Sequence, residues 1–332
     1  MSSIPTITVA GKQVGRVGYG LMQLSTDSAN ASNEQGSLAA MKAAADAGAT
    51  CWSSASFYGP DYANIRLIAK FFAKYPEYKE KIVLVIKGGY DASTFSSRGK
   101  DIGHVRREIK EMQAILGDKS IDIFLLARLE SSDAVEESFQ NLVTLQKEGL
   151  FNEIGASEIS AASLERASKI TPISLIENEI SLFAYSSEIR KVIAWSETHS
   201  VPIFAYSPLG RGMLTGALKK VDDIAEGNML RMFPQFQGEA FESNVRLVEK
   251  LEEIAKSKGI QTGELALAWL TQLSDFIIPI PGSSKTSRVI SNTQAINIKL
   301  STSELAEIQT FLDTEGVKGD RYPGVFQKEL MV

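Results

Sequence analysis

The sequence is poor in the residues that build disulfides and most metal sites. Its 332 residues include one cysteine, Cys51, and two histidines, His104 and His199. A single cysteine excludes an internal disulfide and a cysteine-based zinc site. Both histidines fall in predicted helices, and neither joins a cluster with acidic residues. We therefore predict no metal site.

Long apolar runs and an excess of basic residues are also missing. No apolar run reaches the roughly 18 residues of a membrane-spanning helix, and the first residues do not resemble a secretory signal. The net charge is −5, from 40 acidic and 35 basic residues, whereas nucleic-acid binding favours a basic face. Apolar residues make up 44% and charged residues 23%, as in soluble globular proteins. We expect a cytoplasmic protein that binds neither nucleic acid nor membrane.

Strand and helix patterns alternate along most of the chain. A hairpin is predicted over 5–14. Strand patterns follow at 14–20, 50–53, 82–87, 121–127, 151–156, 174–179, 202–206 and 276–281. Helix patterns lie at 34–48, 62–74, 102–116, 134–148, 161–169, 186–199, 243–258 and 285–294. Several strand patterns are near-continuous apolar runs, which are typical of strands buried on both faces of a parallel sheet.

Eight strand–helix units without a Gly-x-Gly-x-x-Gly turn favour a closed (β/α)8 TIM barrel. A doubly wound sheet with a C-terminal subdomain is the alternative. Two further helices, at 262–272 and 301–314, belong to no unit, and the second opens with the spacing of a capping box. We predict one barrel domain over 1–332, with an N-terminal β-hairpin and two additional helices. The glycine-rich stretch 207–240 follows the seventh strand, where we expect ligand contacts.

Two residues at predicted strand ends could carry acid–base chemistry. Lys87 closes the apolar run 82–86, and Tyr58 lies just beyond the strand at 50–53. In a barrel such positions face the active site. A free tyrosine titrates near ~10, and a nearby ammonium lowers this pKa by stabilising the phenolate. The pair would suit the proton donor of a carbonyl reduction, although Lys87 taken alone could extend its ammonium to solvent.

The motifs at 51–59, 86–89, 205–210 and 281–288 together resemble the aldo-keto reductase superfamily over nearly the whole chain. The resemblance implies a tetrad of Asp, Tyr, Lys and His around the carbonyl oxygen and a nicotinamide that supplies hydride. Tyr58 and Lys87 match two of the four residues, whereas Ser53 and Ala127 stand where the aspartate and histidine are usual. Because Ser53 is not a carboxylate, we expect Lys87 to lack a neutralising neighbour.

The departures are similar to the yeast pyridoxal reductase branch of the family. That branch also lacks this aspartate and histidine, and it shares Trp52, the Phe-Tyr-Gly of 57–59 and the Ala-Arg of 127–128. On this resemblance Trp52, Phe57 and Arg128 are expected in the substrate pocket. Arg128 would hold an anionic oxygen such as the pyridoxal phenolate, or would instead pair with Glu130 or with the backbone.

The resemblance also implies NADP(H) as the cofactor. Tyr206 would stack on the nicotinamide, Ser157 and Glu177 would hold its carboxamide, and the loop after Tyr206 would fold over the pyrophosphate. Lys285 and Arg288, at a helix start, form an anion site that favours NADP over NAD. The expected cofactor residues are Gly20, Met22, Ser157, Glu177, Tyr206, Ser207, Leu209, Gly210, Arg211, Ser283, Lys285, Arg288 and Asn292.

We therefore expect an NADP-dependent oxidoreductase of the pyridoxal reductase type, active in vitamin B6 metabolism on a small carbonyl substrate. Tyr58 would donate the proton as the aldehyde becomes an alcohol. Two alternatives stay open: the same chemistry on another biosynthetic aldehyde or ketone, and an NADP-binding regulatory barrel without catalysis. The sequence does not indicate an oligomeric state.

Overall fold

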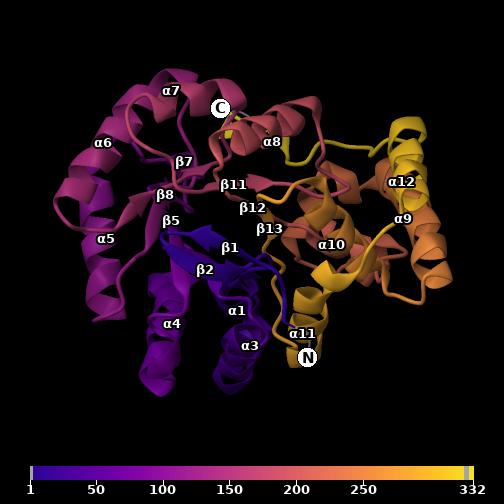
Figure 1. Ribbon diagram of the computed structural model, residues 1–332, viewed down its shortest axis with the longest axis horizontal. Coiled ribbons are helices and arrows are strands. Elements are labelled where there is room, and N and C mark those ends of the chain that lie inside the picture. The colour runs from indigo at the N-terminus through magenta and orange to yellow at the C-terminus, as the bar shows by residue number, and fades with distance from the viewer. Residues whose placement is uncertain (1–2, 325–328) are drawn as a thin grey trace.

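Parallel strands form a ring at the centre of the molecule, with helices on its outside (Figure 1). The computed structural model describes residues 3–324 and 329–332. One run of paired strands consists of β3 (Tyr19–Gly20), β4 (Cys51–Ala55), β5 (Val83–Gly88), β8 (Ile123–Leu126) and β9 (Glu153–Ile154). The other run consists of β10 (Ala156–Ser157), β11 (Ile176–Glu179), β12 (Ile203–Tyr206) and β13 (Ile277–Pro279).

Two glycines join these runs into a closed barrel. Gly155 separates β9 from β10, and its N–H donates to the carbonyl oxygen of Phe124, so one extended segment continues from the first run into the second. At the other seam the N–H of Gly18 donates to the carbonyl oxygen of Pro279 at 2.9 Å. A Cβ on Gly18 would lie 2.7 Å from the backbone oxygen of Cys51, so this close approach requires glycine.

The helices follow the predicted alternation. After successive strands come α3 (Glu34–Asp46), α4 (Ala63–Lys74), α5 (Ile102–Leu116), α6 (Val135–Lys147), α7 (Ala161–Ser168), α8 (Ser187–His199), α9 (Gly238–Ser257) and α11 (Thr286–Gln294). The additional helices are α10 (Thr262–Leu273) and α12 (Thr302–Thr314). The capping box of α12 is present, since Ser301 and Glu304 each accept a hydrogen bond from the other's backbone N–H.

The hairpin covers one end of the barrel. Its strands, β1 (Thr6–Val9) and β2 (Lys12–Gly15), pair antiparallel, and Val9 and Val14 pack in the same apolar cluster as the barrel interior. Lys12 also forms a 3.2 Å ion pair with Asp122, just before β8. The predicted strand at 14–20 was wrong in extent, because the chain leaves the hairpin at Gly15 and rejoins the sheet only at β3.

The stretch 207–240 contains short helical turns instead of a long irregular loop. These turns are η4 (Gly210–Thr215), η5 (Val221–Asp223), η6 (Met229–Met232) and η7 (Pro234–Phe236). The following helix, α9, starts at Gly238, five residues before its predicted start at 243. Two short helices, α1 (Gln23–Thr26) and α2 (Ser28–Ala31), likewise lie where a loop was expected after β3.

Candidate active site

Tyr58 and Lys87 lie together at the carboxyl ends of β4 and β5, the end of a barrel that carries ligands. The Lys87 nitrogen is 5.3 Å from the centroid of the Tyr58 ring. Lys87 is only 5% exposed, so its ammonium does not extend to solvent. The structure thus brings the predicted acid–base pair together.

A carboxylate from across the barrel neutralises Lys87. Glu177, on β11, accepts a hydrogen bond from Lys87 Nζ at 2.6 Å. The Ser53 hydroxyl lies between them, 2.8 Å from Lys87 Nζ and 2.9 and 3.1 Å from the two Glu177 carboxylate oxygens. The expectation that Lys87 lacks a neutralising neighbour was therefore wrong.

Strand alternation explains how these three distant positions meet. Successive side chains of a strand point to opposite faces, and Cys51, Val85 and Leu175 belong to the apolar cluster inside the barrel. The residues two positions further along the same strand segments are Ser53, Lys87 and Glu177. All three consequently point inward and meet above the apolar interior.

The pKa values of both Lys87 and Tyr58 are raised, so each group keeps its proton to a higher pH than it would in water. Burial by itself would lower the pKa of the Lys87 ammonium, but attraction to Glu177 and then to Tyr58 raises it above its ordinary value. The pKa of Tyr58 is also raised, chiefly by burial; Lys87 opposes this shift and Glu177 adds to it. The lysine acts on the phenol in the predicted direction, but burial is the larger effect.

Trp52 does not line the pocket. Its side chain is completely buried on the outside of β4, with ring centroids 4.8 Å from Phe71 and 6.1 Å from Phe72 of α4. Because the next residue, Ser53, points into the barrel, alternation turns Trp52 toward the helices. Its prediction as a substrate residue was wrong, and its role in the structure is to pack α4 onto the sheet.

Phe57 lies beside Tyr58 and a second aromatic residue. Its ring centroid is 5.3 Å from those of both Tyr58 and Tyr90. Tyr90 belongs to β6 (Tyr90–Asp91), which pairs with β7 (Ser96–Ser97) just after β5. Sequence reasoning missed this small hairpin, because two-residue strands leave no periodic pattern.

Arg128 follows β8, and its charge weakly opposes the burial that raises the pKa of Tyr58. Its guanidinium donates to the carbonyl oxygen of Ala127 at 2.6 Å, which is the backbone contact considered from the sequence. Glu130, the other partner considered, instead lies 3.8 Å from Lys100. Among residues 3–324 and 329–332, no carboxylate forms an ion pair with Arg128, although its charge acts on Glu158 at longer range.

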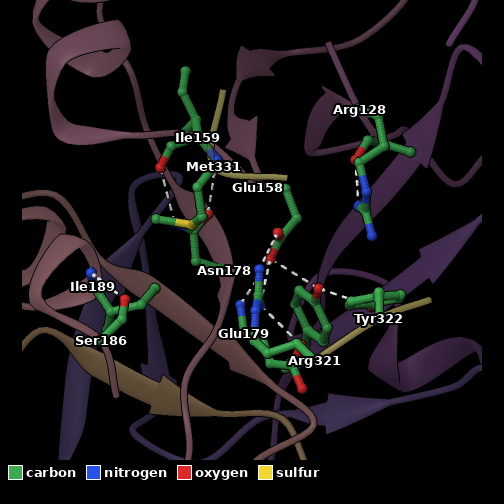
Figure 2. Close-up of polar contacts among 12 residues, drawn as sticks. Arg128, Glu158, Ile159, Asn178, Glu179, Ser186, Ile189, Arg321, Tyr322 and Met331 are labelled. Carbon is green, nitrogen blue, oxygen red and sulfur yellow. Dashed lines mark hydrogen bonds and ion pairs between the residues drawn. The ribbon is translucent and has the colours of Figure 1, made fainter. Parts of the chain in front are cut away.

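A second group of buried charges lies at neighbouring strand ends (Figure 2). Arg321, from the C-terminal segment, donates to Glu158 and to Glu179 at 2.9 and 2.8 Å. Arg211 also donates to Glu179, at 2.9 Å. The Tyr206 hydroxyl donates to Glu158 at 2.8 Å. These two acids, two arginines and one tyrosine thus meet one another's need for hydrogen bonds and opposite charge. They lie at the carboxyl ends of the strands, which we call the mouth of the barrel.

The C-terminal segment covers part of that mouth. The Tyr322 hydroxyl is 3.1 Å from that of Tyr206. The Val332 N–H donates to the carbonyl oxygen of Glu158, and the Ser160 N–H donates to that of Val332, which places the C-terminus near α7 (Figure 1). Sequence reasoning missed these contacts, although an acid at a strand end such as Glu158 signals a cationic partner when it is buried.

The nearby arginines affect the pKa values of Glu158 and Glu179 to different extents. Burial by itself would raise the pKa of Glu158, but the charges of Arg321 and then Arg128 lower it to about 2. For Glu179 burial is the largest effect, and its pKa stays above the ordinary value although Arg211 and Arg321 oppose the shift. Glu158 is therefore the acid whose ionised form stabilises the folded state.

Among the predicted cofactor residues, all of which the structure describes, Ser157 is the one with a buried side-chain atom that lacks a hydrogen-bond partner. It is 4% exposed on β10, and its hydroxyl oxygen has no hydrogen-bond partner in the described part of the chain. Buried polar groups are nearly always satisfied, so this hydroxyl fits a ligand amide. Glu177, the other residue expected at the carboxamide, is engaged by Lys87 and Ser53.

The predicted phosphate site lies at the start of α11. Lys285 and Arg288 are exposed there, and Asn292 is half-buried on the same helix. The Ser283 hydroxyl accepts a hydrogen bond from the Lys285 N–H at 3.1 Å. Exposed cations at a helix N-terminus fit an anionic group such as a phosphate.

The remaining predicted cofactor residues follow β3 and β12. A Cβ on Gly20 would lie 2.7 Å from the Ile280 carbonyl oxygen, and Met22 is 46% exposed. After β12 the chain turns sharply, with positive φ at Ser207, Gly210 and Arg211 and with Leu209 half-buried. Arg211 differs from expectation, because its charge is engaged by Glu179 and its guanidinium lies over the Tyr322 ring.

No group of three or more histidine, cysteine and acidic residues within 3–324 and 329–332 could hold a metal ion. His104 is half-buried on α5, and His199 stacks on Trp195 at the end of α8, with centroids 4.0 Å apart. Over the same residues, no helix has the length and apolarity needed to cross a bilayer.

The sequence profile of the Aldo/keto reductase family matches residues 16–313. This protein belongs to that family. It is 32% identical over 334 residues to "Probable pyridoxal reductase 2" from Schizosaccharomyces pombe, covering 98% of this chain and 99% of the relative. It is 34% identical over 326 residues to "Aldo-keto reductase yakc [NADP(+)]" of the same organism, covering 97% and 95%.

Solved structures share the fold of this aldo/keto reductase. Glycerol dehydrogenase AKR11B4 from Gluconobacter oxydans superposes with a TM-score of 0.81 at 20% identity, covering 96% of this chain and 98% of that one. An aldo/keto reductase from Klebsiella pneumoniae, in complex with NADP and acetate, gives a TM-score of 0.68 at 20% identity, covering 96% and 99%. The predicted (β/α)8 barrel and the predicted family are confirmed.

The charges at the barrel mouth lead to a stability prediction. Arg321→Met should destabilise the protein by about 3 kcal/mol at neutral pH, because it leaves buried Glu158 and Glu179 short of positive charge. The pKa of Glu158 is about 2 in the folded protein and near ~4.3 in an unfolded chain. Ionised Glu158 therefore contributes its full stabilisation above the unfolded-state pKa of ~4.3. This contribution is lost as the pH falls from that pKa toward the folded-state pKa of about 2.

Urea unfolding of wild type and Arg321→Met at about pH 7 and about pH 4 measures this effect, and the stability gap should narrow at the lower pH. Arg106→Met is the matched control, because Arg106 forms a solvent-exposed pair with Glu148 and exposed pairs contribute little. Equal losses for the two variants would contradict the assignment.

Proposed function

We propose that this protein is an NADPH-dependent reductase that converts an aldehyde, of the pyridoxal type, to the alcohol. The observation that carries the proposal is the cluster of half-buried Tyr58 with buried Lys87, Ser53 and Glu177 at the ligand end of the barrel. The S. pombe relatives, named as a pyridoxal reductase and as an NADP(+) aldo-keto reductase, support the same reaction class. A carbonyl reductase needs a positioned proton donor, and Tyr58 is one.

The reaction joins hydride and proton at one carbonyl group. NADPH, when bound, supplies the hydride for the carbonyl carbon. Tyr58 gives its phenolic proton to the carbonyl oxygen as negative charge grows there, so the C=O double bond becomes a C–O single bond with one new C–H bond and one new O–H bond. Lys87 stabilises the phenolate that remains, and a proton from solvent restores the tyrosine. Ala127, in the usual place of a histidine, gives no side-chain hydrogen bond to the oxygen.

The residues present fit NADP(H). The unsatisfied Ser157 hydroxyl suits the carboxamide, and Lys285 and Arg288 at the start of α11 suit the 2′-phosphate. Tyr206 and the turn after β12 lie at the same end of the barrel, where the nicotinamide and pyrophosphate would bind.

Arg128 favours substrates with an anionic oxygen. Its guanidinium donates to the Ala127 carbonyl, and its charge acts on Tyr58. The pKa of Arg128, which burial alone would lower, is raised by the surrounding tyrosines and Glu158, so the side chain stays charged. The ring phenolate of pyridoxal is such an oxygen.

Two alternatives are separated by one assay. A reductase for another aldehyde or ketone would consume NADPH with some members of a carbonyl panel but not with pyridoxal. A regulatory NADP-binding barrel would bind NADPH and consume it with none. The acid–base cluster favours an enzyme over the regulatory barrel.

Tyr58→Phe keeps the aromatic ring but removes the donated proton. Turnover of the best aldehyde in the panel should fall about 10²–10⁴-fold, with NADPH affinity nearly unchanged. Steady-state kinetics and a fluorescence titration with NADPH measure the two quantities. Full activity in Tyr58→Phe would show that another group donates the proton.

Arg288→Ala tests the phosphate site. NADPH binding should weaken about tenfold to a hundredfold through the loss of charge-assisted hydrogen bonds, while NADH binding should change much less. Fluorescence titrations with each cofactor measure both constants, and Arg107→Ala, an exposed arginine on α5, is the control. Equal weakening for NADPH and NADH would refute the assignment.

Arg128→Leu tests the substrate anion. The variant should raise KM for pyridoxal about tenfold or more, because a charge-assisted hydrogen bond is lost, and should change KM for benzaldehyde little. Arg128→Lys, which keeps the charge, should lie between wild type and Arg128→Leu. A uniform change for both aldehydes would leave Arg128 with a structural role alone.

A further inference from the structure

We infer that Glu177 is a positioning residue of the acid–base pair: its carboxylate holds the Lys87 ammonium charged and fixed beside Tyr58. The inference deepens the proposed function and rests on it for its catalytic meaning. The ion pair itself is a property of the folded chain, so it can be tested whether or not the substrate is known.

Burial makes the carboxylate necessary. The side chains of Lys87 and Glu177 are 6% and 2% exposed, with their charged atoms 2.6 Å apart. A buried ammonium without a counter-charge tends to lose its proton, and a neutral amine would no longer stabilise a phenolate. Arg128 is another charged group that acts on Tyr58, and its positive charge makes the requirement for Glu177 stronger.

Ser53 connects the two charged groups and defines the geometry. Its hydroxyl accepts a hydrogen bond from Lys87 Nζ at 2.8 Å and can donate to either oxygen of Glu177. Three inward-facing residues of β4, β5 and β11 therefore form a closed hydrogen-bonded set. Because position 53 also lies within contact distance of Lys87, a carboxylate placed there could take over the role of Glu177.

The negative charge of Glu177 should control when Tyr58 and Lys87 lose a proton. In the wild type, the negative charge of Glu177 opposes the loss of the first proton from the Tyr58–Lys87 pair. Glu177→Gln keeps the shape of the side chain but removes that charge, so the first proton should leave the coupled pair at lower pH. The double variant Ser53→Asp/Glu177→Gln restores one negative charge next to Lys87 and should reverse the shift.

The first experiment follows Lys87 directly in the full-length protein. NMR titration of protein labelled with 13C at the lysine Cε, with the Lys87 signal assigned through Lys87→Met, gives its titration midpoint. In Glu177→Gln the midpoint should fall by about one pH unit or more, and in the double variant it should return toward the wild-type value. Asp122→Asn is the matched control, because Lys119 and Asp122 form another buried pair, 2.7 Å apart and before β8; this change should leave the Lys87 midpoint unmoved.

The second experiment measures the pH profile of kcat/KM for the best aldehyde. The alkaline limb should move to lower pH in Glu177→Gln and return in the double variant, whereas a merely structural role would lower activity without moving the limb. An unmoved Lys87 midpoint in folded Glu177→Gln would overturn the inference. If Glu177→Gln does not fold, the double variant decides: a Lys87 midpoint like that of the wild type supports the inference, and a lower one overturns it.

The two experiments separate this inference from the proposed function. Wild-type protein that reduces no carbonyl compound contradicts the function, while its NMR titration still tests the pairing of Lys87 with Glu177. Active wild-type protein with an unmoved Lys87 midpoint in Glu177→Gln contradicts the inference and leaves the function intact.

Discussion

The buried ion pair between Lys87 and Glu177 is the interaction on which the candidate site depends. A lysine at the end of an apolar strand can stay charged inside a barrel only if an opposite charge meets it there. The closed ring of strands supplies that charge from β11, far from β5 in the sequence. The proton chemistry proposed for Tyr58 then follows from a lysine that is held both charged and in place.

The same requirement explains the second group of charges at the barrel mouth. Glu158 and Glu179 end neighbouring strands and are buried, so each needs positive charge close by. Arg211, from the segment after β12, and Arg321, from the C-terminal segment, provide it. These ion pairs thus hold the segment after β12 and the C-terminal segment over the end of the barrel where the cofactor and substrate are expected to bind.

Strand alternation decides which side chains can take part in chemistry. Trp52 and Ser53 are adjacent in sequence, yet one packs α4 onto the sheet and the other bridges the lysine and its carboxylate. The family resemblance alone places Trp52 in the substrate pocket, because matching residues along the sequence does not show which face of the strand each side chain is on. Counting in steps of two from the apolar interior would have excluded Trp52 and included Glu177.

The sequence by itself determined the barrel, the family and the Tyr58–Lys87 pair, because periodic apolar patterns and short motifs are local signals. It also placed α10 and the capping box of α12 within a few residues of their positions. Only the tertiary structure decided that Glu177 neutralises Lys87 and that Arg321 joins Glu158 to Glu179. These partners lie 90 to 163 residues apart, and no local pattern states which distant charges meet once the strands close into a ring.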